Sequence, residues 1–262
     1  MHLPVAPACN IQCGFCNRKY SCVNESRPGV TARVMSPHEA IELAIRAVNA
    51  MPNISVAGIA GPGDPLANPS ETLEMLELLA RNLPNLHLCL STNGLALPEY
   101  VHKLAQLGVK YLTVTVNAVD PEIGSAIYSQ ITTPTGRESG KESAAYLLKC
   151  QLEGIEQAVK YGMTVKINTV AIPGLNIDHI PMIAHKVASL GASLMNCIPM
   201  AAVEKTSLYN YGEPPEADLK KAREEAGKWL PQMKHCGRCR ADALGLLGEK
   251  GILQDFAREK QA

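Results

Sequence analysis

Two hydrophobic patterns alternate along the chain. Short apolar runs predict buried strands over residues 54–59, 87–91, 111–117, 164–171 and 194–199. Apolar residues at helical spacing predict helices over residues 36–48, 70–83, 98–107, 144–161, 180–190 and 215–229. Strands alternating with helices are typical of right-handed βαβ units around a parallel sheet. About six such units are too few for a closed eight-stranded barrel.

Two segments depart from this regular alternation in opposite ways. The first helix has the clearest start, because Ser36 is a good N-cap, Pro37 suits the first helical position and Glu39 completes a capping box. Residues 120–143 are instead rich in Thr, Ser, Gly and Pro. That composition predicts a long functional loop or lid.

Polar residues alternate with apolar ones on several predicted strands. In a curled parallel sheet the helix-facing positions are apolar, so the polar positions mark the inner face, or lumen. The positions concerned are His87, Cys89, Ser91, Thr113, Thr115, Asn117, Lys166, Asn168 and Asn196. The lumen is therefore expected to be polar near the strand ends, where barrel enzymes keep their sites.

Composition narrows the class of protein. The 262 residues are 46% hydrophobic, enough for one α/β domain with a substantial core. The 25 basic residues are spread along the chain and balanced by 25 acidic ones, which predicts no nucleic-acid partner and no anionic membrane surface. No apolar run approaches the ~20 residues of a membrane span, and the start lacks signal-peptide features, so a cytoplasmic protein is expected.

Three cysteines near the start carry the most specific signal. Cys9, Cys13 and Cys16 form a C-x3-C-x2-C pattern on a glycine-containing loop, residues 9–16, here called the cluster loop. Three thiolates at this spacing can hold three corners of a 4Fe-4S cluster and leave the fourth iron open for a small molecule. A zinc knuckle is an alternative, although zinc usually needs paired spacings and a fourth ligand. A disulfide framework fits less well, because nothing suggests secretion.

With Phe15 just before the third cysteine, the cluster loop resembles the radical S-adenosylmethionine (SAM) superfamily. The resemblance implies a partial (βα)6 TIM-like barrel with the cluster loop after the first strand. It also implies that the open iron binds the amino and carboxylate groups of SAM. An electron from the cluster then cleaves the sulfonium and gives a 5'-deoxyadenosyl radical.

The same resemblance suggests where SAM would be held. The turn at Gly63 and Asp64 stands where the superfamily carries a Gly-Gly-Glu-like motif for the SAM amino group, although here Pro62 and Asp64 depart from that pattern. An ordinary Pro/Gly turn is the alternative. Further residues matching strand ends that usually meet SAM are Ser91, Asn93, Thr115, Asn117, Ile167 and Asn168.

Further cysteines suggest a second metal site. Cys236 and Cys239 form a C-x2-C pair, which can be a redox dithiol, half a zinc site or half a cluster site. Cys22 and Cys89 are candidate ligands as well, whereas Cys150 and Cys197 are better read as small core residues. We expect residues 1–230 to form the barrel and residues 231–262 a tail that closes its mouth.

Taken together, the cluster loop with Cys22, the run Ala-Gly-Pro-Gly-Asp-Pro and the terminal His-Cys-Gly-Arg-Cys resemble a narrower family, the nitrogenase-cofactor maturases. The resemblance implies that two further 4Fe-4S units, K1 and K2, fuse with a SAM-derived carbon and a sulfur into an 8Fe-9S-carbide precursor. Cys22 and Cys89 would belong to K1, and Cys236 and Cys239 to K2. It also implies an upstream His and Cys that complete these sites, whereas this chain begins at Met1.

The hypothesis that follows uses SAM twice. One molecule methylates a cluster sulfide, and a radical from a second takes hydrogen from that methyl group, with Glu25 as a candidate proton acceptor or simply a solvated loop carboxylate. Expected partners are cluster donors and cofactor carriers of nitrogenase assembly and an electron donor such as a ferredoxin. The alternatives are a radical SAM enzyme with an auxiliary cluster and an organic substrate, or a cluster carrier without turnover.

Overall fold

The computed structural model describes residues 1–19, 33–233, 243–244 and 251–252. Its centre is a five-stranded parallel sheet in the order β2-β3-β4-β7-β8. These strands are β2 (Val56–Ile59), β3 (His87–Thr92), β4 (Val109–Thr115), β7 (Thr164–Ala171) and β8 (Leu194–Pro199). The predicted strands are confirmed, and the bounds of β7 and β8 agree with those expected from the sequence.

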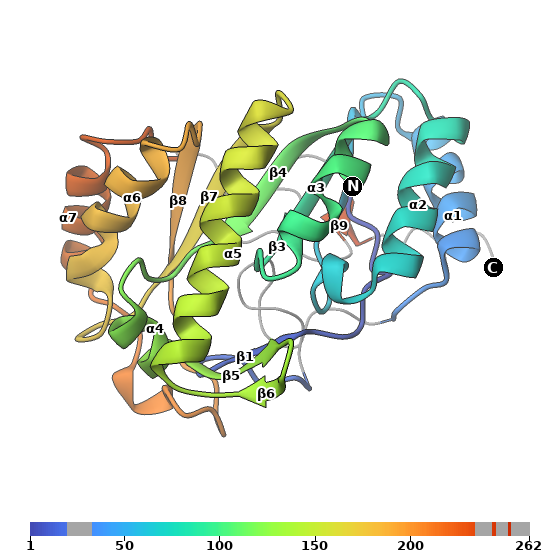
Figure 1. Ribbon diagram of the computed structural model, residues 1–262. Coiled ribbons are helices and arrows are strands. Elements are labelled where there is room, and N and C mark those ends of the chain that lie inside the picture. The colour runs from blue at the N-terminus through green and yellow to red at the C-terminus, as the bar shows by residue number, and fades with distance from the viewer. Residues whose placement is uncertain (20–32, 234–242, 245–250, 253–262) are drawn as a thin grey trace.

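Helices follow the strands and cover one side of this sheet, where Figure 1 shows them in a row. They are α1 (Pro37–Ala50), α2 (Pro69–Asn82), α3 (Leu97–Gln106), α5 (Lys141–Lys160), α6 (Ile180–Ala188) and α7 (Glu216–Ala226). Leu90 and Leu112 of the sheet and Leu79 and Leu104 of the helices are among the fully buried side chains between the two layers. Burying each stabilises the fold by roughly 1.5–3 kcal/mol relative to exposure.

The N-terminal residues extend the sheet beyond β2. His2 and Ala6 form isolated parallel bridges with Gly58 and Pro62, and Leu3 N donates to Gly58 O at 2.9 Å. This segment therefore occupies the position of a first strand, followed by the cluster loop and then by α1. The expected six strand–helix units are confirmed, and the fold is an open partial barrel rather than a closed one across the described strands.

Residues 120–143 correct the sequence-based expectation of a long loop. They form α4 (Pro121–Ile127) and the hairpin of β5 (Tyr128–Thr133) and β6 (Gly136–Glu138), and α5 begins at Lys141. β5 also pairs antiparallel with β1 (Ile11–Cys13), giving a second sheet in the order β1-β5-β6. The prediction was wrong because it took Thr as a loop residue, whereas Thr is also β-branched and suits strands, and Thr132 and Thr133 lie in β5.

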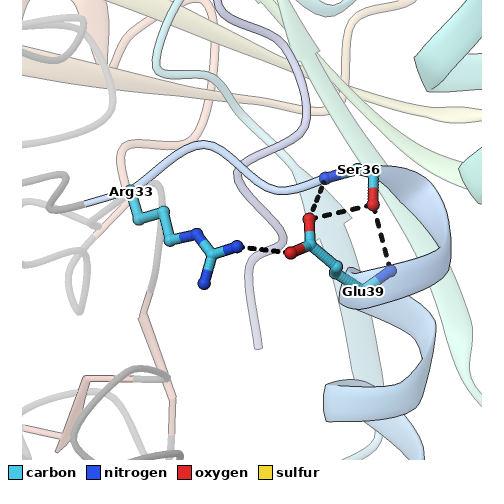
Figure 2. A network of polar contacts seen from close by, with 3 residues as sticks. All are labelled: Arg33, Ser36 and Glu39. Atoms are coloured by element: carbon cyan, nitrogen blue, oxygen red, sulfur yellow. Dashed lines mark hydrogen bonds and ion pairs between the residues drawn. The ribbon is translucent and has the colours of Figure 1, made fainter.

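The capping box at the start of α1 is present as predicted. Ser36 Oγ accepts from Glu39 N at 3.3 Å, and the Glu39 carboxylate accepts from Ser36 N at 2.9 Å (Figure 2). The Arg33 side chain pairs with the same carboxylate. These hydrogen bonds from Ser36 lower the pKa of Glu39.

The remaining elements are short. They are the 3-10 turns η1 (Pro65–Ala67), η2 (Ile177–His179) and η3 (Tyr209–Tyr211) and the strand pair β9 (Ala243–Leu244) and β10 (Gly251–Ile252). Within the described residues, the helices are all too short or too polar to cross a membrane. Residues 231–233 still pair with β8 through Met195, and most of the expected tail lies outside the described residues, so its division from the barrel stays a prediction.

Candidate functional site

A single cavity gathers the cluster loop and the carboxyl ends of neighbouring parallel strands. Loops at this edge of a parallel sheet are where α/β folds usually bind ligands. The lining residues are Cys9, Ile11, Cys13, Phe15, Cys16, Arg18, Ala60, Gly63, Asp64, Ser91, Thr92, Asn93 and Thr115. The structure therefore brings together nine of the residues predicted from the sequence, from four separate segments of the chain.

The three cysteines are held by the fold of the cluster loop. Cys13 is buried within β1, whereas Cys9 and Cys16 are half-buried. The Gln12 amide donates to the carbonyls of Cys16 at 2.6 Å and of Cys13 at 3.1 Å. Phe15 is almost fully buried and anchors the loop in the smaller core beneath it. This anchoring fixes the backbone from which all three thiols project.

Two of the three thiols, those of Cys9 and Cys16, have raised pKa values. Burial raises the pKa of Cys9 to about 11, with a further contribution from the nearby Asp64 carboxylate. Burial also raises the pKa of Cys16, while the Arg18 guanidinium lowers it through its charge and a hydrogen bond. Metal binding at these thiols therefore has to release protons, which the metal's affinity for thiolate must drive.

Asp64 ties two strand-end loops together beneath the cavity. It is buried, and its carboxylate accepts hydrogen bonds from Leu66 N at 2.9 Å, Thr92 Oγ1 at 3.0 Å and Asn93 N at 2.6 Å. Burial raises the pKa of Asp64, and the hydrogen bonds from Asn93 and Thr92 oppose that rise. The carboxylate thus fixes the β2 loop against the β3 loop whatever ligand the cavity takes.

Asparagines join these loops to the cluster loop. Asn93 Nδ2 donates to Asn10 Oδ1 at 2.7 Å and lies 3.8 Å from Cys9 Sγ. Asn68 bonds both the N–H and the carbonyl of Ala8, at 3.0 and 2.9 Å. At Gly63 a Cβ would lie only 2.0 Å from the Ala8 carbonyl oxygen, so this close approach requires glycine. The cluster loop is therefore held rigidly against the sheet.

The other residues expected to meet SAM divide into two groups. Ser91 and Thr115 line the cavity, as the predicted alternation of polar positions requires. Asn117, Ile167 and Asn168 do not line it. Ile167 pairs with Val114 and packs with it in the large hydrophobic core, and the Asn117 amide oxygen accepts from Val170 N at 2.9 Å. A contact of these three residues with SAM stays a prediction.

The second predicted metal site is described only in part. Cys22, Glu25, Cys236 and Cys239 lie outside the described residues. Cys89 is half-buried on β3, two positions before Ser91 and so on the same face of the strand, but it does not line the cavity. Its role as a K1 ligand stays a prediction.

Some residues of the site were not singled out from the sequence. Thr92 and Asn68 bond the Asp64 loop, and Arg18 lines the cavity beside Cys16. A Cβ on Gly58 would lie 2.8 Å from His2 Cδ2 and 3.6 Å from Cys89 Cβ, which places the His2 ring near Cys89. A charged residue two positions after Cys16 was the one available signal, because the other contacts join segments far apart in the sequence.

The donor set fits an iron–sulfur cluster and a polar cosubstrate. Three thiols border one cavity, and thiolates are the usual ligands of such clusters. The hydroxyls of Ser91 and Thr115 and the amide of Asn93 line the same cavity and offer hydrogen bonds to a polar molecule. Across the described part of the chain, no three His, Cys, Asp or Glu side chains are grouped as ligands of one metal ion.

Known proteins share both the fold and much of the sequence. The chain aligns over 87% of its length with the crystal structure of Streptococcus suis SuiB bound to S-adenosylmethionine, with a TM-score of 0.61 and 15% identity, covering 47% of that chain. This likeness shows the fold alone. Residues 3–187 match the family described as the radical SAM superfamily.

Sequence relatives narrow the family. The FeMo cofactor biosynthesis protein NifB of Chlorobaculum tepidum is 48% identical over 95% of this chain and 59% of its own length. The NifB of Methanocaldococcus jannaschii is 45% identical over 99% of this chain and 86% of its own length. The chain spans only 50% to 59% of the bacterial relatives it matches. The chain belongs to the radical SAM superfamily and, within it, to the family of the FeMo cofactor biosynthesis protein NifB.

Proposed function

We propose that this protein is a radical SAM enzyme of nitrogenase cofactor synthesis, with a resident 4Fe-4S cluster on Cys9, Cys13 and Cys16. Its substrates would be the K1 and K2 4Fe-4S units, which it fuses with a SAM-derived carbide and a sulfur into an 8Fe-9S-C precursor. When bound, the resident cluster and SAM supply reductive cleavage of the sulfonium and a 5'-deoxyadenosyl radical. Iron–sulfur donors, cofactor carriers and an electron donor would be its partners.

One observation carries the proposal, namely the shared cavity of three cysteine thiols and the polar ends of β3 and β4. The thiols would hold three irons of the cluster and leave one iron for SAM, and Ser91, Asn93 and Thr115 line the same cavity. Hydroxyl and amide groups at hydrogen-bonding range suit the amino, carboxylate and ribose groups of SAM. Sequence identity of 45% with a NifB of similar length supports the substrate assignment.

The side chains around the cavity would position SAM and would not themselves take part in the reaction. Asp64, held by Thr92 and Asn93, keeps the β2 and β3 loops at a fixed separation, and its charge suits a neighbouring SAM ammonium group. Gln151 donates from α5 to the carbonyls of Asn93 and Thr115, both at 2.9 Å. Such support from a rigid helix holds a cosubstrate in reactive geometry. Apolar packing around Phe15 would exclude water from beneath the cluster.

The test is anaerobic reconstitution followed by addition of SAM and dithionite. We expect both 5'-deoxyadenosine and S-adenosylhomocysteine, because the proposed reaction uses SAM as radical source and as methyl donor. Absence of both products from iron-loaded protein would contradict the proposal. Formation of 5'-deoxyadenosine alone would favour a radical SAM enzyme acting on another substrate.

A further inference from the structure

The small sheet β1-β5-β6 has two unlike faces. Ile11 pairs with Ile131, and both are buried in the smaller core. The alternate positions pair Gln12 with Gln130 and Thr132 with Arg137. Because neighbouring positions point to opposite faces, these polar side chains share the outer face of the sheet. Gln130, Thr132 and Arg137 are exposed there.

A polar pocket opens on this outer face beside the cluster loop. It is formed by the loop itself, by Arg18 and by Gln130, Thr132 and Arg137. It has two arginines and no Asp or Glu among its lining residues. Arg18 donates to the Pro7 carbonyl at 2.6 Å, and within the described residues the Arg137 guanidinium has no hydrogen-bond or ion-pair partner. The pocket is therefore a site of positive charge that suits carboxylates.

This pocket lies directly behind the cysteines. Gln12, on the outer face, donates to the Cys16 carbonyl at 2.6 Å, and Arg18 borders both this pocket and the cavity on the other side of the loop. Cys9, Ile11 and Arg18 border both spaces, so the cluster loop lies between the cavity and the positively charged pocket.

We propose that the outer face of the β1-β5-β6 sheet, with Arg18 and Arg137, is the docking surface for an acidic one-electron donor protein. Carboxylates of the donor would pair with the two guanidinium groups and bring its redox centre against the cluster loop. One electron then passes to the cluster, the donor is oxidised by one electron, and no bond forms or breaks. This inference rests on the proposed function, because it needs a redox cluster on Cys9, Cys13 and Cys16.

The outer face of the β1-β5-β6 sheet has the features expected of a short-lived electron-transfer complex. Electron-transfer encounters commonly bury less than about 1,200 Å² and depend on charge complementarity for their rate. Two arginines beside an open pocket supply such steering without a large apolar patch. The association should therefore weaken as salt rises.

The experiment compares two reductants of the anaerobically reconstituted chain by stopped-flow spectroscopy. One is a reduced plant-type ferredoxin, chosen as an acidic protein donor, and the other is reduced methyl viologen, a small cation. The variants are Arg137→Glu and, as a matched charge reversal, Lys110→Glu. Lys110 is exposed near the amino end of β4, whereas the cavity lies at the carboxyl ends of the strands.

We expect the ratio of the ferredoxin rate to the viologen rate to fall about tenfold or more in Arg137→Glu. It should stay within about twofold in Lys110→Glu, and the salt dependence of the ferredoxin rate should flatten only in Arg137→Glu. Equal ratios in the two variants overturn the docking surface. Loss of inorganic phosphate binding in Arg137→Glu without a change in this ratio would mark a small-anion site and overturn it as well.

Iron analysis separates this inference from the proposed function. A protein without a reducible 4Fe-4S cluster contradicts the proposed function itself. A protein that viologen reduces normally, with equal ferredoxin rates in both variants, contradicts only the docking surface.

Discussion

The two sheets of this protein differ in how deeply they are buried and in what they contribute to the candidate site. The parallel sheet β2-β3-β4-β7-β8 is covered by helices on one side, and polar residues at its carboxyl ends line the cavity. The small antiparallel sheet β1-β5-β6 has one exposed face, and its first strand is part of the cluster loop. In the proposed function the large sheet would hold SAM, while the small sheet includes Cys13, one of the three proposed cluster ligands.

The largest predicted effect concerns the small sheet. Cys13→Ala should reduce the iron of the SAM-binding cluster, about four atoms per chain, to background and abolish SAM cleavage, because it removes one of three ligands. The matched control is Cys150→Ala, a buried cysteine of α5 that lines neither pocket. Iron analysis and product chromatography check both. Full iron content in Cys13→Ala would remove β1 from the metal site.

The next prediction concerns the close contact between Gly63, after β2, and Ala8, just before the cluster loop. Gly63→Ala should destabilise the fold by about 3 kcal/mol and lower cluster loading, because its Cβ would lie 2.0 Å from the Ala8 carbonyl oxygen. Gly124→Ala is the control, since the nearest atom to its added Cβ is the Ala144 Cβ at 3.2 Å. Urea unfolding and iron content report the two effects. Equal behaviour of both variants would show that the close approach is unimportant.

A smaller effect is expected from the hydrogen bonds by which Asp64 joins the loops after β2 and β3. Asp64→Asn should cost about 2 kcal/mol, because an amide group cannot accept all the hydrogen bonds from Thr92, Asn93 and Leu66 and leaves buried donors unpaired. The exposed Asp178→Asn serves as control. Urea unfolding of both variants measures the difference. A loss no larger than that of the control would contradict the role of Asp64 in joining the loops.

The smallest effect lies far from both the cavity and the pocket. Ser36→Ala should destabilise the protein by about 1 kcal/mol through loss of the α1 N-cap, with cluster content unchanged. The lowered pKa of Glu39 means that the capping box stabilises above the usual pKa of this carboxyl and loses its effect as the pH falls through the lowered value. The difference between wild type and variant should therefore shrink on acidification. Thermal unfolding at neutral and acidic pH checks the trend.

The sequence predicted the large sheet better than the small one for a physical reason. Strands of the large sheet such as β7 alternate buried Val165 and Ile167 with polar Lys166 and Asn168, and helix starts such as Ser36 carry local capping signals. The β5–β6 hairpin is mostly exposed and polar, so its residues resemble a loop. The hairpin forms strands because β5 pairs with β1, which lies more than a hundred residues earlier in the chain.

The candidate site shows the same division. Cys9, Cys13 and Cys16 and the alternation of Ser91 and Thr115 were accessible from spacing alone. The hydrogen bonds of Asp64 with Thr92 and Asn93 join residues 28 and 29 positions apart, and no local sequence pattern predicts them. Ile167 packs in the core with Val114 while Asn168 takes the alternate face, and a contact of either residue with SAM stays a prediction.

The central claim is that three thiols of the cluster loop hold a 4Fe-4S cluster with one open iron. Electron paramagnetic resonance of the reduced, reconstituted chain, recorded with and without SAM, tests it most directly. The account predicts a cluster signal that changes shape when SAM is added, because SAM binds the open iron. A signal that SAM leaves unchanged, or protein that binds one zinc ion in place of the cluster, would contradict it.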